Sequence, residues 1–334
     1  TAAAGPLLLT PGKAKASEQL AIALWGGRFT ENFEIAYLKP FTEETGIPVL
    51  AVGSPDMAKV RAMVKTNNVD WDLILPVSSW VTAGEHEGTW EDIDYSIVDM
   101  TDAADGTKRD QALGFEIVSG GIAWSKERDG EPGQHPETFA QFFDPEAIEG
   151  RRGLRTRPGE TFEMALLGDG VKPEDLYPLD IERAFKALDR IKDSVSNWIA
   201  ATPKTIELIS QNECDFTYTY NGRVYGAQQA GLPIDYSFKQ NINFVDWMAV
   251  IKGTKNKDAA MRLLAFIMRP DRQAAMTNLM AYPGTNTKSY ELVKPEVQSW
   301  LPDLSNPNSA MLDIDWWGEN QEVVEKRFKE WQLT

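Results

Sequence analysis

Apolar positions recur with two different spacings in the first part of the chain. Short aliphatic runs that begin at 19, 47 and 71 predict buried strands. The segments between them, 31–46 and 55–67, carry apolar residues at helical spacing, and they predict two helices. Strands that alternate with helices indicate an α/β domain built on a largely parallel sheet.

The rest of the chain repeats these two patterns with different residues. Paired strands are predicted at 111–126, and a further strand is predicted at 214–222. Helices are predicted at 136–148, 159–170, 180–199, 202–213, 255–280 with a break near Pro270, and 313–332. The chain has no internal repeat or flexible linker, so this order indicates two α/β lobes joined by short crossover strands, which is a hinge architecture.

A single acid interrupts one of the apolar runs. Asp246 stands in the stretch NFVDWMAVIKG (243–253), where the surrounding residues predict a strand that enters a sheet. Burying a carboxylate costs free energy unless a cation or hydrogen-bond donors compensate it. The pattern therefore raises the question of which cation Asp246 binds.

The length and charge of the chain exclude several classes of protein. With 334 residues, the chain is long enough for two domains. Its 50 acidic and 34 basic residues give a formal net charge of −16. This balance argues against nucleic acid or an anionic membrane surface as a partner, because both require a basic face. No apolar run approaches the roughly 18 residues that a membrane-spanning helix needs.

The first residues resemble the end of a secretory signal peptide. Residues 1–16 are small and apolar, contain a Pro-Gly break and end in Ala14-Lys15-Ala16, which fits an A-x-A cleavage site. We therefore expect a periplasmic protein whose signal peptide is cleaved near Ala16. The alternative is a disordered, alanine-rich tail.

Signatures of catalysis are missing from the sequence. Cys214 is the only cysteine, and His86 and His135 are the only histidines. The chain contains no G-x-S-x-G, H-E-x-x-H or P-loop motif. Two distant histidines and one cysteine form no metal cluster. We therefore expect a protein that is not an enzyme and that uses no cofactor or metal.

Aromatic and small polar residues follow several of the predicted strands. Trp25 ends the first strand, Ser78 and Ser79 follow the third, and Tyr220 and Arg223 follow a later one. In an open α/β sheet, ligands bind beyond the carboxyl ends of the strands. One such aromatic residue is typically part of the core, but several strand ends together favour a lined cleft between two lobes.

Four stretches of the chain resemble one protein family. They are similar to periplasmic solute-binding proteins of ABC importers, of the spermidine/putrescine-binding type that also includes γ-aminobutyrate (GABA) binders. The stretches are LWGGRFTENFEIAYLKPFTEETGIPV (24–49), PETFAQFFDPEAIEGRRGLRTRPGETFEMALLGDG (136–170), YPLDIERAFKALDRIK (177–192) and YNGRVYGAQQAGLPIDY (220–236).

The resemblance implies a two-lobed periplasmic-binding-protein fold of type II. Each lobe would be a mostly parallel sheet flanked by helices, and hinge strands would join the lobes. We expect 17–120 and 247–300 to form lobe 1, and 121–246 and 301–334 to form lobe 2. Such a receptor binds a small solute between its lobes and delivers it to the membrane permease of an ABC transporter. It is expected to be a monomer that binds no nucleic acid.

The resemblance also implies a set of solute-binding residues. Asp246 falls at the position of an ammonium-binding aspartate, and Glu160 at that of a second carboxylate. Aromatic and polar positions of the family's cleft correspond to Trp25, Ser78, Ser79, Tyr220, Phe244 and Tyr282.

One position departs from the pattern of the polyamine binders. Arg157 stands where they carry an aspartate for the second ammonium, and Arg223 is a further candidate partner for an anion. Arginine repels a diamine and binds a carboxylate in bidentate fashion. A GABA-like zwitterion or a polyamine is the expected solute. A small organic acid or other anion on Arg157 and Arg223, a solvated basic loop at 151–157, and an enzyme on the same scaffold are the alternatives.

Overall fold

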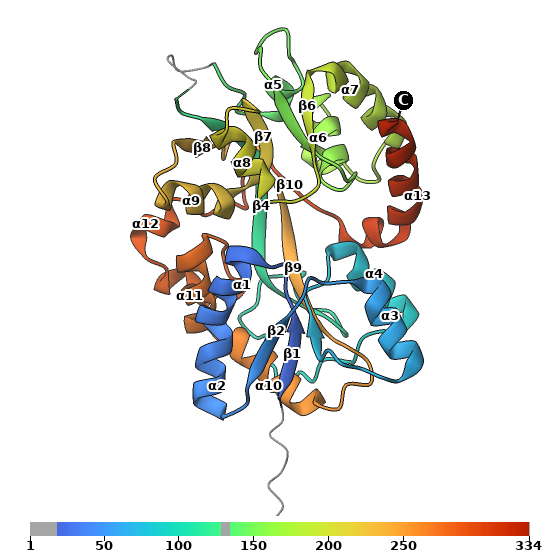
Figure 1. Ribbon diagram of the computed structural model, residues 1–334, viewed down its shortest axis with the longest axis vertical. Coiled ribbons are helices and arrows are strands. Elements are labelled where there is room, and N and C mark those ends of the chain that lie inside the picture. Colours follow the sequence, from blue (N-terminus) through green and yellow to red (C-terminus); the bar gives the residue numbers. More distant parts are fainter. Residues whose placement is uncertain (1–18, 128–133, 334) are drawn as a thin grey trace, which may run out of the picture.

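One hydrogen-bonded sheet extends through the molecule in the computed structural model, which describes residues 19–127 and 134–333. The predicted signal peptide at 1–16 lies outside the described residues. The strand order is β2-β1-β3-β9-β4-β7-β5-β6, with β10 beside β9 and β8 beside β4 (Figure 1). The strands are β1 Leu20–Ala23, β2 Val49–Val52, β3 Leu73–Ile74, β4 Leu113–Ser125, β5 Arg152–Arg155, β6 Val195–Ile199, β7 Phe216–Tyr220, β8 Ile234–Tyr236, β9 Ile242–Val250 and β10 Ala310–Met311.

Two halves share this sheet, and each half has a parallel core as predicted. In the lower half of Figure 1, β1 pairs in parallel with β2 and β3. In the upper half, β5 pairs in parallel with β6 and β7. The long strands β4 and β9 pair with each other in antiparallel fashion and connect the halves. The two-lobed α/β fold is therefore confirmed, whereas the lobe boundaries at 120, 246 and 300 remain a prediction.

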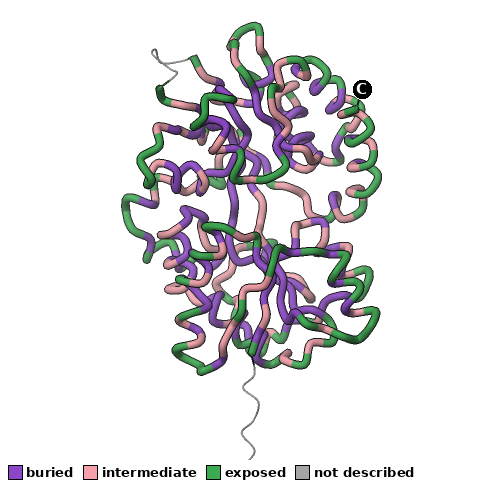
Figure 2. The backbone as a smooth tube through the Cα atoms, in the orientation of Figure 1, coloured by how far each residue is buried: buried purple, intermediate pink, exposed green. Residues whose placement is uncertain are grey.

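Helices cover both sides of the sheet in each half, and their outward faces carry the exposed residues (Figure 2). In the lower half, the segment predicted as one helix at 31–46 is divided by a π-helical turn just before Pro40, which has no N–H for the helical ladder. The lower helices are α1 Gly27–Phe33, η1 Glu34–Leu38, α2 Lys39–Thr45, α3 Met57–Thr66, α4 Ser78–Glu87, α10 Lys257–Ile267 and α11 Pro270–Met280. The remaining helices are α5 Phe139–Phe142, α6 Thr161–Gly168, η2 Pro173–Asp175, α7 Ile181–Ile191, η3 Lys192–Ser194, α8 Lys204–Ser210, α9 Asn221–Gln229, η4 Thr287–Leu292, α12 Pro295–Gln298 and α13 Ile314–Gln332.

The prediction of paired strands at 111–126 is wrong. This segment forms the single strand β4, and nearly all of its residues are buried. Gly120 and Gly121 make no turn there. A Cβ atom on Gly120 would lie 1.8 Å from the Tyr218 hydroxyl, and one on Gly121 would lie 2.4 Å from Nδ2 of Asn241. These glycines are needed because neighbouring side chains pack directly on the backbone of the strand.

The prediction of one helix at 180–199 is also wrong in its second half. Helix α7 ends at Ile191, a short turn follows, and 195–199 forms β6. Strand β6 pairs in parallel with β5, so Trp198 lies beside Leu154. The apolar spacing continues through the segment, but an available sheet edge decides the conformation of its last residues.

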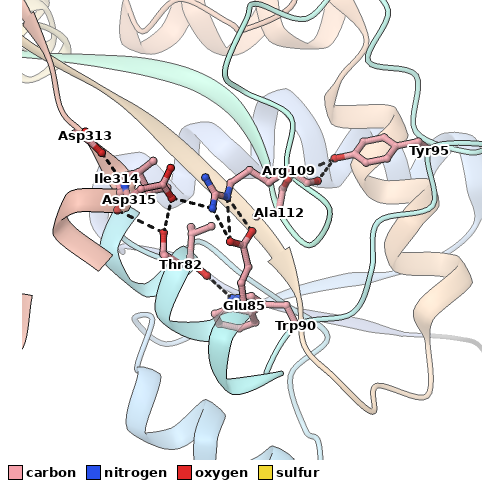
Figure 3. Close-up of polar contacts among 10 residues, drawn as sticks. Thr82, Glu85, Trp90, Tyr95, Arg109, Ala112, Asp313, Ile314 and Asp315 are labelled. Atoms are coloured by element: carbon pink, nitrogen blue, oxygen red, sulfur yellow. Dashed lines mark hydrogen bonds and ion pairs between the residues drawn. The ribbon is translucent and has the colours of Figure 1, made fainter. Parts of the chain in front are cut away.

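Helix α13 packs against α4 across the gap between the two halves (Figure 3). The Thr82 hydroxyl donates to Oδ1 of Asp315 at 3.3 Å. Arg109 forms ion pairs with Glu85 at 2.7 Å and with Asp315 at 3.0 Å. A Cβ atom on Gly318 would lie 2.4 Å from Cβ of Thr82, so the close approach of these helices depends on a glycine in α13.

We predict that Gly318→Ala lowers the free energy of unfolding. Alanine normally stabilises a helix by about 1 kcal/mol relative to glycine. Here its methyl group overlaps Thr82, and overpacking of this kind costs roughly 1–3 kcal/mol. Urea denaturation measures the difference. Val323→Ala, at a 65% exposed site of the same helix, is the control and should change stability by less than about 0.5 kcal/mol. A Gly318→Ala protein more stable than wild type would contradict the prediction.

Candidate functional site

A cavity of about 450 Å³ lies between the two halves of the molecule. The lower half contributes Trp25 after β1 and Ser78 at the start of α4. The upper half contributes the segment after β5 and the junction of β7 with α9. Strand β9 supplies Phe244 and Asp246 from the middle of the sheet. The cavity therefore lies beyond the carboxyl ends of strands from both halves, where α/β proteins bind ligands.

The structure brings all the predicted site residues to this one cavity. They are Trp25, Ser78, Ser79, Arg157, Glu160, Tyr220, Arg223, Phe244, Asp246 and Tyr282. Their contact with a solute remains a prediction. Arg157 lines the cavity, so the alternative of a basic loop directed only to bulk solvent is wrong for this residue.

Glu160 is fully occupied by neighbouring donors. Its Oε1 accepts hydrogen bonds from Nη2 of Arg157 and from the Tyr220 hydroxyl, and its Oε2 accepts from the Tyr218 hydroxyl at 2.9 Å. Burial raises the pKa of Tyr220 to about 12, so this hydroxyl stays protonated and able to donate. The carboxylate is therefore neutralised by Arg157 and has little capacity left for a cation of the solute.

The backbone at Glu160 is strained. Its φ angle is +68°, in a region that non-glycine residues rarely adopt, and it directly precedes α6. The three hydrogen bonds to its side chain hold this conformation in place. Strain of this kind is concentrated at functional sites, where the surrounding structure stabilises it.

Asp246 has another carboxyl group, that of Glu116, directly beside it. The two residues lie directly opposite each other on the antiparallel strands β4 and β9. Burial raises the pKa of Asp246 to about 7. Burial and the charge of Asp246 raise the pKa of Glu116 well above its ordinary value. Asp246 lines the cavity and therefore has a second, buried carboxyl group directly beside it.

Two arginines around the cavity have nitrogen atoms without hydrogen-bond partners. They are Nε of Arg223 and both Nε and Nη1 of Arg155. The remaining terminal nitrogen of Arg155 donates to the Ala200 carbonyl at 3.0 Å and to the Thr202 hydroxyl at 3.1 Å. Because Glu160 neutralises Arg157, the charges of Arg155 and Arg223 make this part of the site favourable for an anion.

Aromatic rings line the cavity on opposite sides. Trp25 packs against Trp80 with ring centroids 6.2 Å apart, and Tyr220 packs edge-on against Phe244 at 5.6 Å. The Trp25 side chain is 37% exposed even though it is large and apolar. Exposed aromatic faces in a concave site are suited to the methylene chain of a small solute.

Sequence reasoning missed three residues of the site that the structure identifies. Glu116 is a lone acid within an apolar strand, so the rule that drew attention to Asp246 applies to it equally. Arg155 lies in the basic run where only Arg157 was considered. Trp317 comes from α13, and no local pattern predicts that this helix reaches the cavity.

Trp317 is held at the cavity by a buried carboxyl group. Its Nε1 donates to Oε1 of Glu163 at 2.6 Å, and the Tyr177 hydroxyl donates to the same oxygen at 2.5 Å. Burial raises the pKa of Glu163 to about 7. Glu163 thus connects α6 to the helix that packs across the gap between the halves.

The described residues contain neither a group of His, Cys, Asp or Glu side chains suited to a metal ion nor a helix long and apolar enough to cross a membrane. Cys214 is buried and makes no disulfide.

Comparison with known families defines the class of this protein. Residues 36–302 match the family model described as bacterial extracellular solute-binding protein. The chain belongs to this family. The relatives named below are solute-binding proteins. The two-lobed fold and the cavity between the halves agree with that class.

Individual relatives differ in what their names say they bind. The chain is 30% identical to the gamma-aminobutyric acid-binding protein of Pseudomonas aeruginosa, over 94% of this chain and 91% of that protein. It is 27% identical to the spermidine/putrescine-binding periplasmic protein of Escherichia coli, over 88% and 86%. Its structure is similar to that of the PBP AgtB from A. tumefaciens R10 in complex with agropinic acid, with a TM-score of 0.85, 33% identity and coverage of 96% and 100%.

We predict that Glu163 makes the ligand-free protein less stable as pH rises. In the folded protein Glu163 stays protonated up to about pH 7, whereas a glutamate in the unfolded chain loses its proton at about pH 4.3. Protonation of Glu163 therefore stabilises the folded protein fully at pH values below the pKa of the unfolded chain. This stabilisation is lost as pH rises through the pKa of Glu163 in the folded protein. Glu163→Gln keeps an acceptor for Tyr177 and Trp317 but does not titrate, so its free energy of unfolding should fall less between about pH 5 and pH 8.

Urea denaturation at several pH values measures this slope. Glu174→Gln, at a side chain that is 65% exposed, is the matched control and should leave the slope as in wild type. Equal slopes for wild type and Glu163→Gln would contradict the prediction.

Proposed function

We propose that this chain is the periplasmic receptor of an ABC importer and that it binds a short GABA-like zwitterion. The solute ammonium would lie at Asp246, and its carboxylate at Arg223, because Arg157 is already paired with Glu160. The observation that carries the proposal is the separation of charge within one cavity. Asp246 lines the cavity from β9, and arginines without full hydrogen bonding lie on the upper side.

The hydrogen bonds of Glu160 argue against a polyamine. A diamine needs a carboxylate for its second ammonium. The family resemblance implies an aspartate for it at the position of Arg157, and Glu160 is the remaining acid of that set. Here its two oxygens already accept from Arg157, Tyr218 and Tyr220. A second ammonium would have to displace Arg157 or lie beside its positive charge, and both cost free energy.

The aromatic residues suit the chain between the two charged ends. Burial of each methylene contributes about 0.8 kcal/mol. An ammonium over an aromatic face gains up to about 2 kcal/mol when it is desolvated. Trp25, Tyr220 and Phe244 supply such faces around Asp246.

A larger acid is the second candidate. The cavity volume of about 450 Å³ is in the range that takes drug-sized ligands, and the free nitrogens of Arg155 offer a further position for an anionic group. The complex of AgtB with agropinic acid supports this possibility. In either case we propose an exported monomer without enzymatic activity, which delivers its solute to a membrane permease and binds no nucleic acid.

Titration calorimetry with GABA, putrescine and succinate tests the class of solute. We expect GABA to bind at least about tenfold more tightly than putrescine, because that ratio requires only about 1.4 kcal/mol. Succinate lacks the ammonium and should bind weakly. Recovery of GABA unchanged after incubation is the result expected for a receptor. Tighter binding of putrescine than of GABA would contradict the proposal.

We predict that Asp246→Asn and Arg223→Ala each weaken GABA binding. A hydrogen bond to a charged group contributes about 1.5–3 kcal/mol, so we expect a loss of about 10- to 150-fold for either variant. Arg190→Ala removes a half-exposed arginine that pairs with Asp169 outside the cavity, and it is the control for a change in net charge. Unchanged GABA affinity in Asp246→Asn would remove this residue from the site.

A further inference from the structure

Glu116 is a buried carboxyl group that the zwitterion proposal does not use. Its side chain lies on β4 opposite Asp246 of β9, and only 1% of the residue is exposed. Among the described residues, neither of its oxygens has a hydrogen-bond partner. A buried, ionised carboxylate would need a cation or several donors to compensate its charge, and Glu116 has neither.

The position of Glu116 follows from the strand register. Residues directly opposite each other on antiparallel strands have their Cβ atoms about 4.5–5.5 Å apart. Val118 lines the cavity two residues further along β4, opposite Phe244. Glu116 therefore faces the same side of the sheet as the cavity, one step deeper than its lining. Two carboxylates at this separation repel each other, and a hydrogen bond between them requires a proton.

The charges around the pair distinguish its two members. Arg157 and Arg223 favour the ionised form of Asp246, whereas Glu160 disfavours it. Burial and the charge of Asp246 raise the pKa of Glu116, and Tyr37 and Tyr282 are close enough for the charge of Glu116 to raise their pKa values. The ionisable groups that face the pair are Tyr37 on η1, with Arg272 of α11 beyond it, Tyr282 after α11, Arg223 on α9, and Arg157 and Glu160 between β5 and α6.

We propose that the carboxyl group of Glu116 is protonated in the ligand-free receptor and that its O–H donates a hydrogen bond to the ionised carboxylate of Asp246. The pair then presents a single negative charge to the solute, and it loses that charge when Asp246 takes up a second proton at lower pH. Glu116 is thus a positioning residue for Asp246, and protons compete with the solute ammonium. The part of the proposal that concerns the ammonium rests on the proposed function, whereas the proton on Glu116 does not.

Infrared spectroscopy of the ligand-free protein tests the proton directly. The difference spectrum of wild type minus Glu116→Gln, recorded at about pH 8, above the pKa of Asp246, should contain the C=O band of a protonated carboxyl group. Subtraction removes the band of Glu163, a buried carboxyl group outside this pair whose pKa is also raised. A difference spectrum that contains only carboxylate bands would show that Glu116 is ionised and would overturn the proposal, whether or not GABA binds.

The pH dependence of GABA binding tests the coupling. In wild type, affinity should fall about tenfold per pH unit below the pKa of Asp246, which is about 7. Glu116→Gln retains a donor for Asp246, so the midpoint of this fall should change little. Glu116→Leu removes the donor, which destabilises the ionised Asp246, so the midpoint should move to higher pH.

The direction of these shifts separates the two states of Glu116. If Glu116 were ionised, both substitutions would remove a repelling charge, and both midpoints would move to lower pH. That result would overturn the inference and leave the proposed function in place. Absence of GABA binding at every pH would overturn the proposed function and the competition with ammonium, and the infrared difference would still decide where the proton lies.

Discussion

The antiparallel pairing of β4 with β9 is the constraint on which the rest of the structure depends. These two strands extend from one half of the molecule to the other, and the parallel strands of each half are assembled beside them. Their register places Glu116 opposite Asp246 and Val118 opposite Phe244. Backbone hydrogen bonds between the two strands fix this register. Side chains from both halves line the cavity beside this pair of strands.

The electrostatics of the cavity follow from what each element contributes. The carboxyl groups stand on β4 and β9, and the arginines come from the upper half, after β5 and at the start of α9. Glu160 and Arg157 form an ion pair and neutralise each other. What remains is an acidic floor beside arginines that lack full hydrogen bonding. In a partly buried site such opposite charges act strongly, and this is the physical basis of the proposed zwitterionic solute.

Local patterns in the sequence were sufficient for much of the fold and for part of the site. Helical spacing predicts α3, α7 and α10, and short aliphatic runs predict β1 and β2, because burial of one face imposes these periods. The same patterns fail where a distant partner decides. Residues 195–199 become a strand because β5 offers an edge, and 111–126 stays a single strand because Tyr218 and Asn241 occupy the space beside its glycines. The rule that singles out a lone acid in an apolar run identifies Asp246, and the same rule applies to Glu116.

The sequence by itself determined the α/β class and part of the cavity, because strand spacing, strand ends and a lone acid are local features that can be read one segment at a time. The family resemblance, and no local pattern, implied Glu160, Phe244 and Tyr282. Tertiary structure alone decided which charges meet. Arg157 reaches Glu160 and Tyr220 through the turn after β5, and Glu116 meets Asp246 through strand register. Trp317 reaches the cavity because α13 packs on α4. Distances between segments far apart in the chain set the strength of these interactions, and no local pattern contains them.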